Sequence, residues 1–291
     1  MHNLLNDSNK STNCTEVYGA IVAELLSYTA TAKNQPVEAT HQTRKKLKLL
    51  RAFAKLIKPA RKSYDYNSVN ILLRDWGRVF SDLRDTHVRD LMLREFAQNS
   101  EYREEVYLID HLINLNNVEL SVLESASLYR ADEFSTLEEN LRNNPLIRKY
   151  FSDHANTQLI LEGYNNSYLK SRYAFRSAFT NHNPEDIHEW RKRAKDLQYQ
   201  TELLMSAESD ENLMNLHANI AEICDALGAA NDLHMLQSWI DEIAKSDESI
   251  NFSVIQNKIN SANRDSMSKA ENRGKLFYET FQEPLLTLIS K

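Results

Sequence analysis

The chain has 291 residues, of which 42% are apolar, and it carries a formal net charge of −6 at pH 7. Its apolar content excludes a largely disordered protein, and its five glycines and five prolines are too few for the turns of an all-β or α/β protein of this size. The acidic net charge argues against a nucleic-acid binder with a basic surface overall.

The first 14 residues are polar and no apolar run reaches the length of a membrane span, so neither export nor membrane insertion is expected. Cys14 and Cys224 lie far apart and outside any CxxC or Cys/His spacing. This usage favours a reduced, cytoplasmic compartment and argues against a structural metal.

Polar breaks and prolines divide the chain into amphipathic stretches, which predict an all-α fold. The expected helices are 15–33, 37–58, 68–82, 86–98, 101–128, 153–181, 185–206, 211–227, 232–245 and 251–282. Asn183 followed by Pro184 is a strong helix start, because an N-cap side chain precedes a residue whose φ is already helical. Residues 129–152 are expected to connect two halves of the chain.

The second expected helix carries an unusual concentration of positive charge. Residues 39–64 contain nine Lys or Arg and no acid, which leaves −15 for the remainder of the chain. On a helical wheel one face is apolar, and the cations lie on the same face as His41, which stands near the start of the helix. These cations are Arg44, Lys45, Lys48, Arg51 and Lys55.

An internal repeat at an offset of 147 residues relates this helix to a second one. His41, Arg44, Lys45 and Lys48 fall on His188, Arg191, Lys192 and Lys195, and at the same offset Asp85 falls on Asp232. Tyr199 lies on the same face of the second helix. Two separated matches at one offset indicate a tandem duplication. The predicted organisation is an N-terminal segment and helix in 1–36, a first half in 37–150 and a second half in 151–291.

Cations spaced one turn apart suit an extended anion running beside the helix. A single run of this kind is usually a solvated face, but its repetition favours a shared anion site. The two histidines are then phosphate donors rather than metal ligands, because neighbouring cations disfavour a metal. Each should also be more readily protonated beside a bound polyanion, so that binding takes up protons.

Two further arginine pairs are expected to extend the site: Arg74 and Arg78 on the next helix, and Arg172 and Arg176 on the helix before the second copy. Asp85 and Asp232 each follow an expected helix break. They are interpreted as helix caps or as buried partners of an arginine.

Four linked motifs resemble the CHAD domain, the conserved-histidine α-helical domain. They are His41-x-x-Arg44-x-x-x-Lys48-x-x-Arg51, Leu83-Arg84-Asp85-x-His87-Val88, His188-x-x-Arg191-Lys192-Arg193-x-Lys195, and Leu227-Gly228-Ala-Ala-Asn231-Asp232-Leu233. The resemblance implies two four-helix bundle halves related by a pseudo-two-fold axis, with the histidine helices lining a basic groove that binds inorganic polyphosphate. Leu49, Asp196 and Gln198 stand where the family often has Arg or Lys, which weakens the second copy.

The resulting hypothesis is a cytoplasmic, non-catalytic polyphosphate-binding or granule-associated protein without a cofactor. Other polyanions, including a nucleic-acid backbone, are the first alternative. Nucleic acid ranks lower because its bases would need aromatic rings to stack on. Phe53, on the apolar face, is the only Phe, Tyr or Trp among residues 41–62. A phosphohydrolase is the second alternative, and it would need acids that only the fold assembles, because no glycine-rich phosphate loop or acid cluster is visible.

Overall fold

The structure is a computed structural model that describes residues 11–100, 102–129, 131–181, 183–205, 211–247 and 249–282. The expected all-α fold is confirmed: the described residues are helical apart from short connections and one small sheet. Of the predicted segments, residues 1–10 and 283–291 lie outside the described part, as do the helix ends placed at 101 and 206. None of the described helices is long and apolar enough to cross a membrane.

The sheet pairs β1 (Ser11–Asn13) with β2 (His154–Asn156) in antiparallel register, with Thr12 opposite Ala155. Before β2 the chain forms α1 (Cys14–Thr29), α2 (Pro36–Leu56), the 3-10 turn η1 (Lys58–Ala60), α3 (Ser63–Val79), α4 (Ser81–Gln98), α5 (Arg103–Tyr129), α6 (Ala131–Asn143) and α7 (Pro145–Phe151). After β2 it forms α8 (Thr157–Asn181), α9 (Pro184–Leu204), α10 (Glu211–Ser246) and α11 (Ser253–Thr280).

Asparagine side chains fix the start of three of these helices. Asn13 accepts hydrogen bonds from the first turn of α1, Asn144 does the same for α7, and Asn183 accepts from the backbone N–H of Asp186 in α9. Pro145 and Pro184 follow two of these caps, where the missing N–H costs nothing. The predicted start at Asn183 and Pro184 is confirmed.

Most helix ends differ from the prediction by a few residues, and three differences change the interpretation of the elements. The expected connection 129–152 holds α6 and α7, because Phe134, Leu137 and Leu141 recur at helical spacing and are buried. The helices expected at 211–227 and 232–245 are one continuous helix, α10. The break in the first half lies at Phe80, between α3 and α4, so that Asp85 and Asp232 are inside helices and the helix-cap interpretation is wrong.

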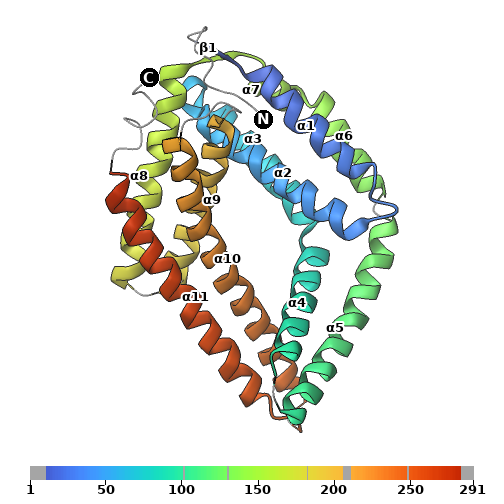
Figure 1. Cartoon of the computed structure of the whole chain (residues 1–291). Helices are drawn as coiled ribbons and strands as arrows, with labels where there is room; N and C mark the ends of the chain where they lie inside the picture. The colour runs from blue at the N-terminus through green and yellow to red at the C-terminus, as the bar shows by residue number, and fades with distance from the viewer. Residues whose placement is uncertain are drawn as a thin grey trace.

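The order of elements agrees with a duplication of the chain. At the 147-residue offset α1 precedes α2 as α8 precedes α9, the pair α3 and α4 takes the place of α10, and α5 takes the place of α11. The repeated helices α2 and α9 pack against each other near the middle of the molecule (Figure 1), where the buried Gln200 side chain donates to the carbonyl of Ala52 at 3.1 Å. A pseudo-two-fold relation between the halves stays a prediction.

The main apolar core lies around α2, α8 and α9 and extends to α1, α3, α6, α7 and the ends of α10 and α11. Trp190 is fully buried in it, with ring centroids 5.1 Å from Phe175 and 5.3 Å from Phe179. Its indole N–H donates to the hydroxyl of Tyr278 at 3.2 Å, which satisfies the one polar atom of the ring. Full burial of one such side chain contributes about 1.5–3 kcal/mol.

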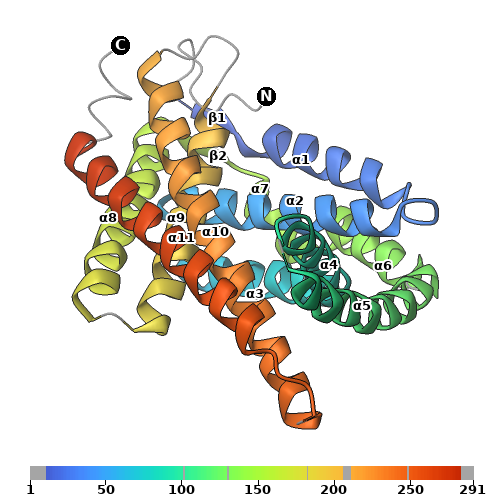
Figure 2. The same cartoon turned by 60° about the horizontal axis from the view of Figure 1, so that its bottom comes forward.

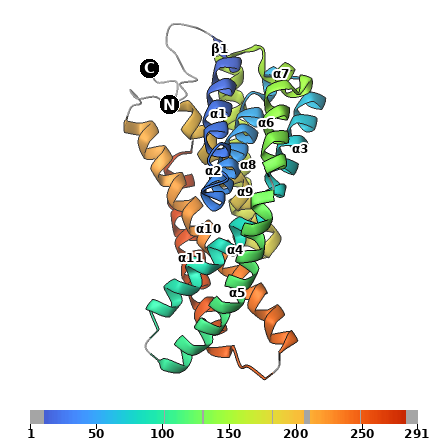
Figure 3. The ribbon, with the colours of Figure 1, turned by 90° about the vertical axis from the view of Figure 1, so that its right-hand side faces the viewer.

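A second, smaller core forms where two helical hairpins cross. The α4–α5 hairpin and the α10–α11 hairpin leave the main body and cross below it (Figures 1 and 3), and Figure 2 shows the two hairpins extending in different directions. Their contact buries Leu93, Ile109, Leu236 and Ile255, one from each helix. The Arg89 guanidinium also lies 4.3 Å from the centroid of the Trp239 ring, which links α4 to α10.

Candidate functional site

A cleft of about 570 Å³ opens between α2, α4, α9 and α10, above the crossing of the hairpins. Its wall combines side chains from both copies of the repeat. The charged and hydrogen-bonding side chains of the wall are His41, Arg44, Lys45, Lys48, Arg84, Asp85, Arg191, Lys195, Tyr199, Asp225, Asn231 and Asp232. Six cations against three carboxylates leave a formal charge of +3 with histidine neutral.

Residues related by the repeat lie in the wall of the same cleft. Arg44 and Lys48 on α2 line it together with Arg191 and Lys195 on α9, their equivalents 147 residues later. The same holds for Asp85 and Asp232, for Arg84 and Asn231, and for Val88 and Met235 on α4 and α10. The sequence repeat therefore becomes one shared cavity rather than two separate surfaces.

The cations of the cleft lie close enough to disfavour one another's charge. Burial against the cleft wall, together with Arg44, Arg191, Lys195 and Arg84, lowers the pKa of Lys48 to about 8. Lys48 is nevertheless exposed to solvent, so water screens part of this effect. Burial is the larger cause of the shift, and the four neighbouring cations add to it; these cations, rather than the shift itself, are what would attract an anion.

Two arginines of the wall are oriented by the protein itself. The Arg44 guanidinium donates to the carbonyl of Gly77 at 2.6 Å, near the end of α3. The Arg84 Nε–H donates to Nδ1 of His41 at 3.2 Å, which joins α4 to α2. Each arginine keeps further N–H groups for a ligand, because a guanidinium carries five.

Arg191 is incompletely satisfied. Its Nε is buried and has no hydrogen-bond partner among the described residues. An orphaned buried donor costs about 1–3 kcal/mol unless water or a ligand completes it. The Tyr199 hydroxyl, also in the wall, keeps its proton because burial raises the pKa of the phenol.

The carboxylates of the cleft are not simple ion-pair partners. Burial raises the pKa of Asp85, while Arg44 and Arg84 oppose that shift and Asp232 adds to it. No ion pair within 4 Å joins Asp85 or Asp232 to an arginine among the described residues. Nowhere in the described ranges do three or more His, Cys, Asp or Glu side chains gather as metal ligands would.

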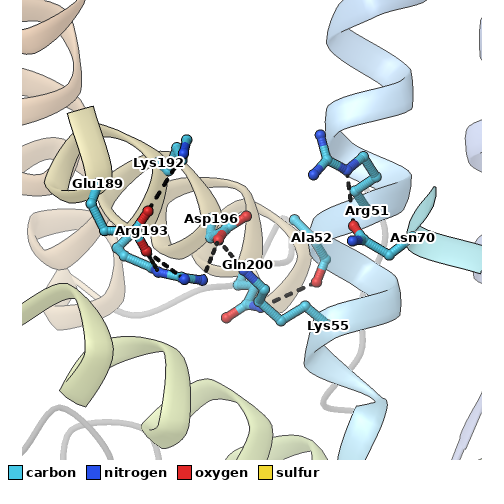
Figure 4. Close-up of polar contacts among 9 residues, drawn as sticks. All are labelled: Arg51, Ala52, Lys55, Asn70, Glu189, Lys192, Arg193, Asp196 and Gln200. Carbon is cyan, nitrogen blue, oxygen red and sulfur yellow. Dashed lines mark hydrogen bonds and ion pairs between the residues drawn. The ribbon is translucent and has the colours of Figure 1, made fainter. Parts of the chain in front are cut away.

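Three of the predicted cations form ion pairs or hydrogen bonds with protein side chains outside the cleft (Figure 4). Lys55 makes an ion pair with Asp196, and Arg51 donates to the Asn70 side chain at 3.0 Å. Lys192 lies 3.5 Å from Glu189 in an exposed ion pair. The wheel placed Arg51 and Lys55 beside Lys48, but α9 crosses α2 at Ala52 and separates them from the cleft.

The remaining predicted residues also lie outside the cleft wall. Arg74 and Arg78 on α3 both pair with Asp75, at 2.8 and 3.6 Å. Arg172 and Arg176 are on α8, on the far side of α9 from the cleft. His188 is exposed at the start of α9, away from the wall. Of the fifteen predicted site residues, the cleft gathers His41, Arg44, Lys45, Lys48, Arg191, Lys195 and Tyr199.

Sequence reasoning did not select Arg84, Asp225 or Asn231 as site residues. Arg84 directly precedes Asp85, which the repeat had already singled out, and this neighbourhood was the available signal. Asp225 has no acidic equivalent at the repeat offset, where Arg78 stands, and only the position of α10 identifies it.

The comparisons with known proteins concern nearly the whole described chain. A family model described as the CHAD domain matches residues 17–241. A search of curated proteins found no match. The crystal structure of the CHAD domain from the plant Ricinus communis is similar, with a TM-score of 0.61 over 97% of this chain and 96% of that chain. At 12% sequence identity this likeness concerns the fold alone.

Proposed function

The chain belongs to the CHAD domain family, and on that premise we propose that it binds inorganic polyphosphate in the central cleft without converting it chemically. The observation that carries the proposal is the meeting of Arg44 and Lys48 with their repeat equivalents Arg191 and Lys195 in one cavity. A flexible chain with negative charge on each unit can contact both helices at once. Its phosphate oxygens also suit the paired N–H groups of arginine.

Two properties of the wall support a phosphate ligand in particular. The orphaned Nε of Arg191 needs an acceptor, which a phosphate oxygen supplies. Besides burial, repulsion from neighbouring cations lowers the pKa of Lys48, and an entering anion would offset that repulsion.

A binding role rather than phosphoryl transfer fits the chemistry of the described residues. Transfer commonly uses metal ions held by acids or a glycine-rich phosphate loop. Asp85, Asp225 and Asp232 line the cleft, but among the described residues they do not form a metal-ligating group. We propose a non-catalytic polyphosphate binder, and its cytoplasmic location and association with polyphosphate granules stay predictions from the sequence.

Calorimetric titration with long-chain polyphosphate should give binding that weakens steeply with salt and needs no divalent metal. Six cations in the cleft imply the release of several counterions on binding. A nucleic-acid complex with about six phosphate contacts loses roughly a thousandfold in affinity when salt rises from ~50 to ~200 mM. We expect a loss of similar order here.

Single-stranded DNA and ATP at matched salt are the comparison ligands. Tyr199 is the only Phe, Tyr or Trp in the described wall, so bases have few rings to stack on and DNA should bind more weakly than polyphosphate. Equal or tighter binding of DNA would favour the nucleic-acid alternative. Affinity retained at molar salt would point to a small-ligand pocket and contradict the proposal.

Polyphosphate affinity should fall as pH rises above about 8, through the titration of Lys48. Burial and neighbouring cations lower the Lys48 pKa to about 8, a shift that solvent reduces because Lys48 is exposed, and a bound anion raises it, so binding takes up a proton at alkaline pH. The loss between roughly pH 7 and pH 9 is up to about tenfold if the bound lysine stays charged. Lys48→Arg, which stays charged, should remove the effect. If Lys48→Arg lost the same affinity for polyphosphate at alkaline pH, the loss would come from the titration of another group.

A further inference from the structure

His41 is engaged by an arginine in a way that determines its protonation. Arg84 donates its Nε–H to Nδ1 of His41 at 3.2 Å, and both side chains are partly buried. An imidazole nitrogen that accepts a hydrogen bond carries no proton. The ring is then neutral, with its one proton on Nε2, and Nε2 has no protein partner among the described residues.

The protonated ring would be disfavoured in the same place. An imidazolium would turn Nδ1–H toward the Arg84 Nε–H and put two positive groups against each other. Lys45 and Lys48 on α2 add to the repulsion, and Glu38 on α2 opposes it. Burial and the Arg84 charge, in that order, lower the pKa of His41.

The second copy of the repeat lacks this contact. Asn231 stands at the position equivalent to Arg84, and its amide donates to the Asp232 side chain at 3.3 Å. His188, the equivalent of His41, is exposed, and none of the hydrogen bonds among the described residues involves it. The chain therefore contains its own comparison: one histidine held by arginine and one without such a partner.

We propose that Arg84 is a positioning residue that holds His41 as the neutral tautomer protonated at Nε2, so that the first half presents phosphate with a fixed, uncharged donor. The phosphate role rests on the proposed function, whereas the tautomer is a property of the free protein. A lowered His41 pKa in the free protein disfavours imidazolium there, so on this proposal His41 contributes less than His188 to the proton uptake expected from sequence.

Nuclear magnetic resonance on the ¹⁵N-labelled free protein tests the contact directly. We expect a nitrogen–nitrogen coupling across the hydrogen bond between Arg84 Nε and His41 Nδ1, and an unprotonated Nδ1 at neutral pH. His188 should show no such coupling. A His41 ring protonated on Nδ1 at neutral pH, or a His41 titration that matches that of His188 without any coupling, would overturn the proposal. This measurement needs no ligand, so its outcome is separate from that of the proposed function.

Arg84→Met supplies the matched change, because it keeps an unbranched side chain and removes both donor and charge. The pKa of His41 should rise toward its ordinary value of about 6.5, and that of His188 should not move. Arg94→Met, an exposed position on the same helix, should leave both unchanged. Polyphosphate affinity of Arg84→Met should then increase as pH falls through the histidine range, with a steeper slope than in the unchanged protein. A His41 titration insensitive to Arg84→Met would show that the contact does not control the ring.

Discussion

Lys48→Glu and Lys195→Glu are each expected to weaken binding of long-chain polyphosphate on the order of a hundredfold, about 2.8 kcal/mol. The two lysines occupy equivalent positions of the repeat and line the same cleft. Each reversal removes an attraction to the ligand and adds a repulsion at the same place. Calorimetry or gel shift at one fixed, moderate salt concentration measures the loss.

Lys269→Glu on α11 is the control, since it makes the same charge change at an exposed position outside the cleft wall. It should cost much less than either cleft variant. A loss confined to Lys48→Glu would show that only the first half binds. Unchanged affinity in both cleft variants would contradict binding in this cavity.

Gly163→Ala is expected to destabilise the fold by about 3 kcal/mol or more. A Cβ at Gly163 on α8 would lie 1.9 Å from the carbonyl oxygen of Leu56, the last residue of α2. Because the obstacle is backbone, α8 and α2 must separate, and overpacking of this kind costs about 1–3 kcal/mol even where side chains yield. Urea or thermal unfolding measures the change.

Gly19→Ala on α1 is the matched control, because nothing lies within 4 Å of its Cβ position. Alanine is a better helix former than glycine, so this variant should gain up to about 1 kcal/mol. Two glycines inside helices are thus expected to respond to the same substitution with opposite signs. A Gly163→Ala protein as stable as the unchanged one would mean that α8 and α2 pack less closely than described.

The sequence repeat correctly identified residues of α2 and α9 that lie together in the structure. The 147-residue offset identified Arg44 with Arg191 and Lys48 with Lys195, and these pairs line one cleft. A duplicated chain would repeat its packing, which would bring equivalent positions to equivalent places; the duplication itself stays a prediction. The helix start at Asn183 was also predictable, since the cap depends on local residues alone.

Helix crossing limited the prediction of the site. A wheel treats α2 as an isolated cylinder and puts Arg51 and Lys55 in line with Lys48, yet α9 crosses at Ala52 and offers Asp196 to Lys55. The neighbourhood of Asp85 points toward Arg84 in the sequence, but the contact of Arg84 with His41, 43 residues away, follows only from the packing of α4 beside α2. Such contacts depend on tertiary packing, which residue spacing does not encode.

The prediction of two helix boundaries was wrong for a different reason. The sequence predicts a helix break that includes Gly228, but Gly228 lies within α10, where the buried neighbours Leu227, Ala230 and Leu233 stabilise the helix across it. The cost of one glycine, about 1 kcal/mol, is smaller than the packing of these side chains. The signal for α6 was present in the spacing of its apolar residues and was overlooked beside Pro145.

The small core at the crossing of the hairpins gives the molecule a second unit of cooperative unfolding. Leu93 and Leu236 belong to that core, while Val88 and Met235, within two turns of them on the same helices, line the cleft. A small apolar core requires less free energy to open than the main core. The backbone amides of the two hairpins should therefore exchange with solvent faster than those of the main body. If the proposed anion bridges α2 and α9 to α4 and α10, it should bind only while the crossing is closed. By linkage, filling the cleft should then slow exchange at amides of the hairpins that the ligand does not contact.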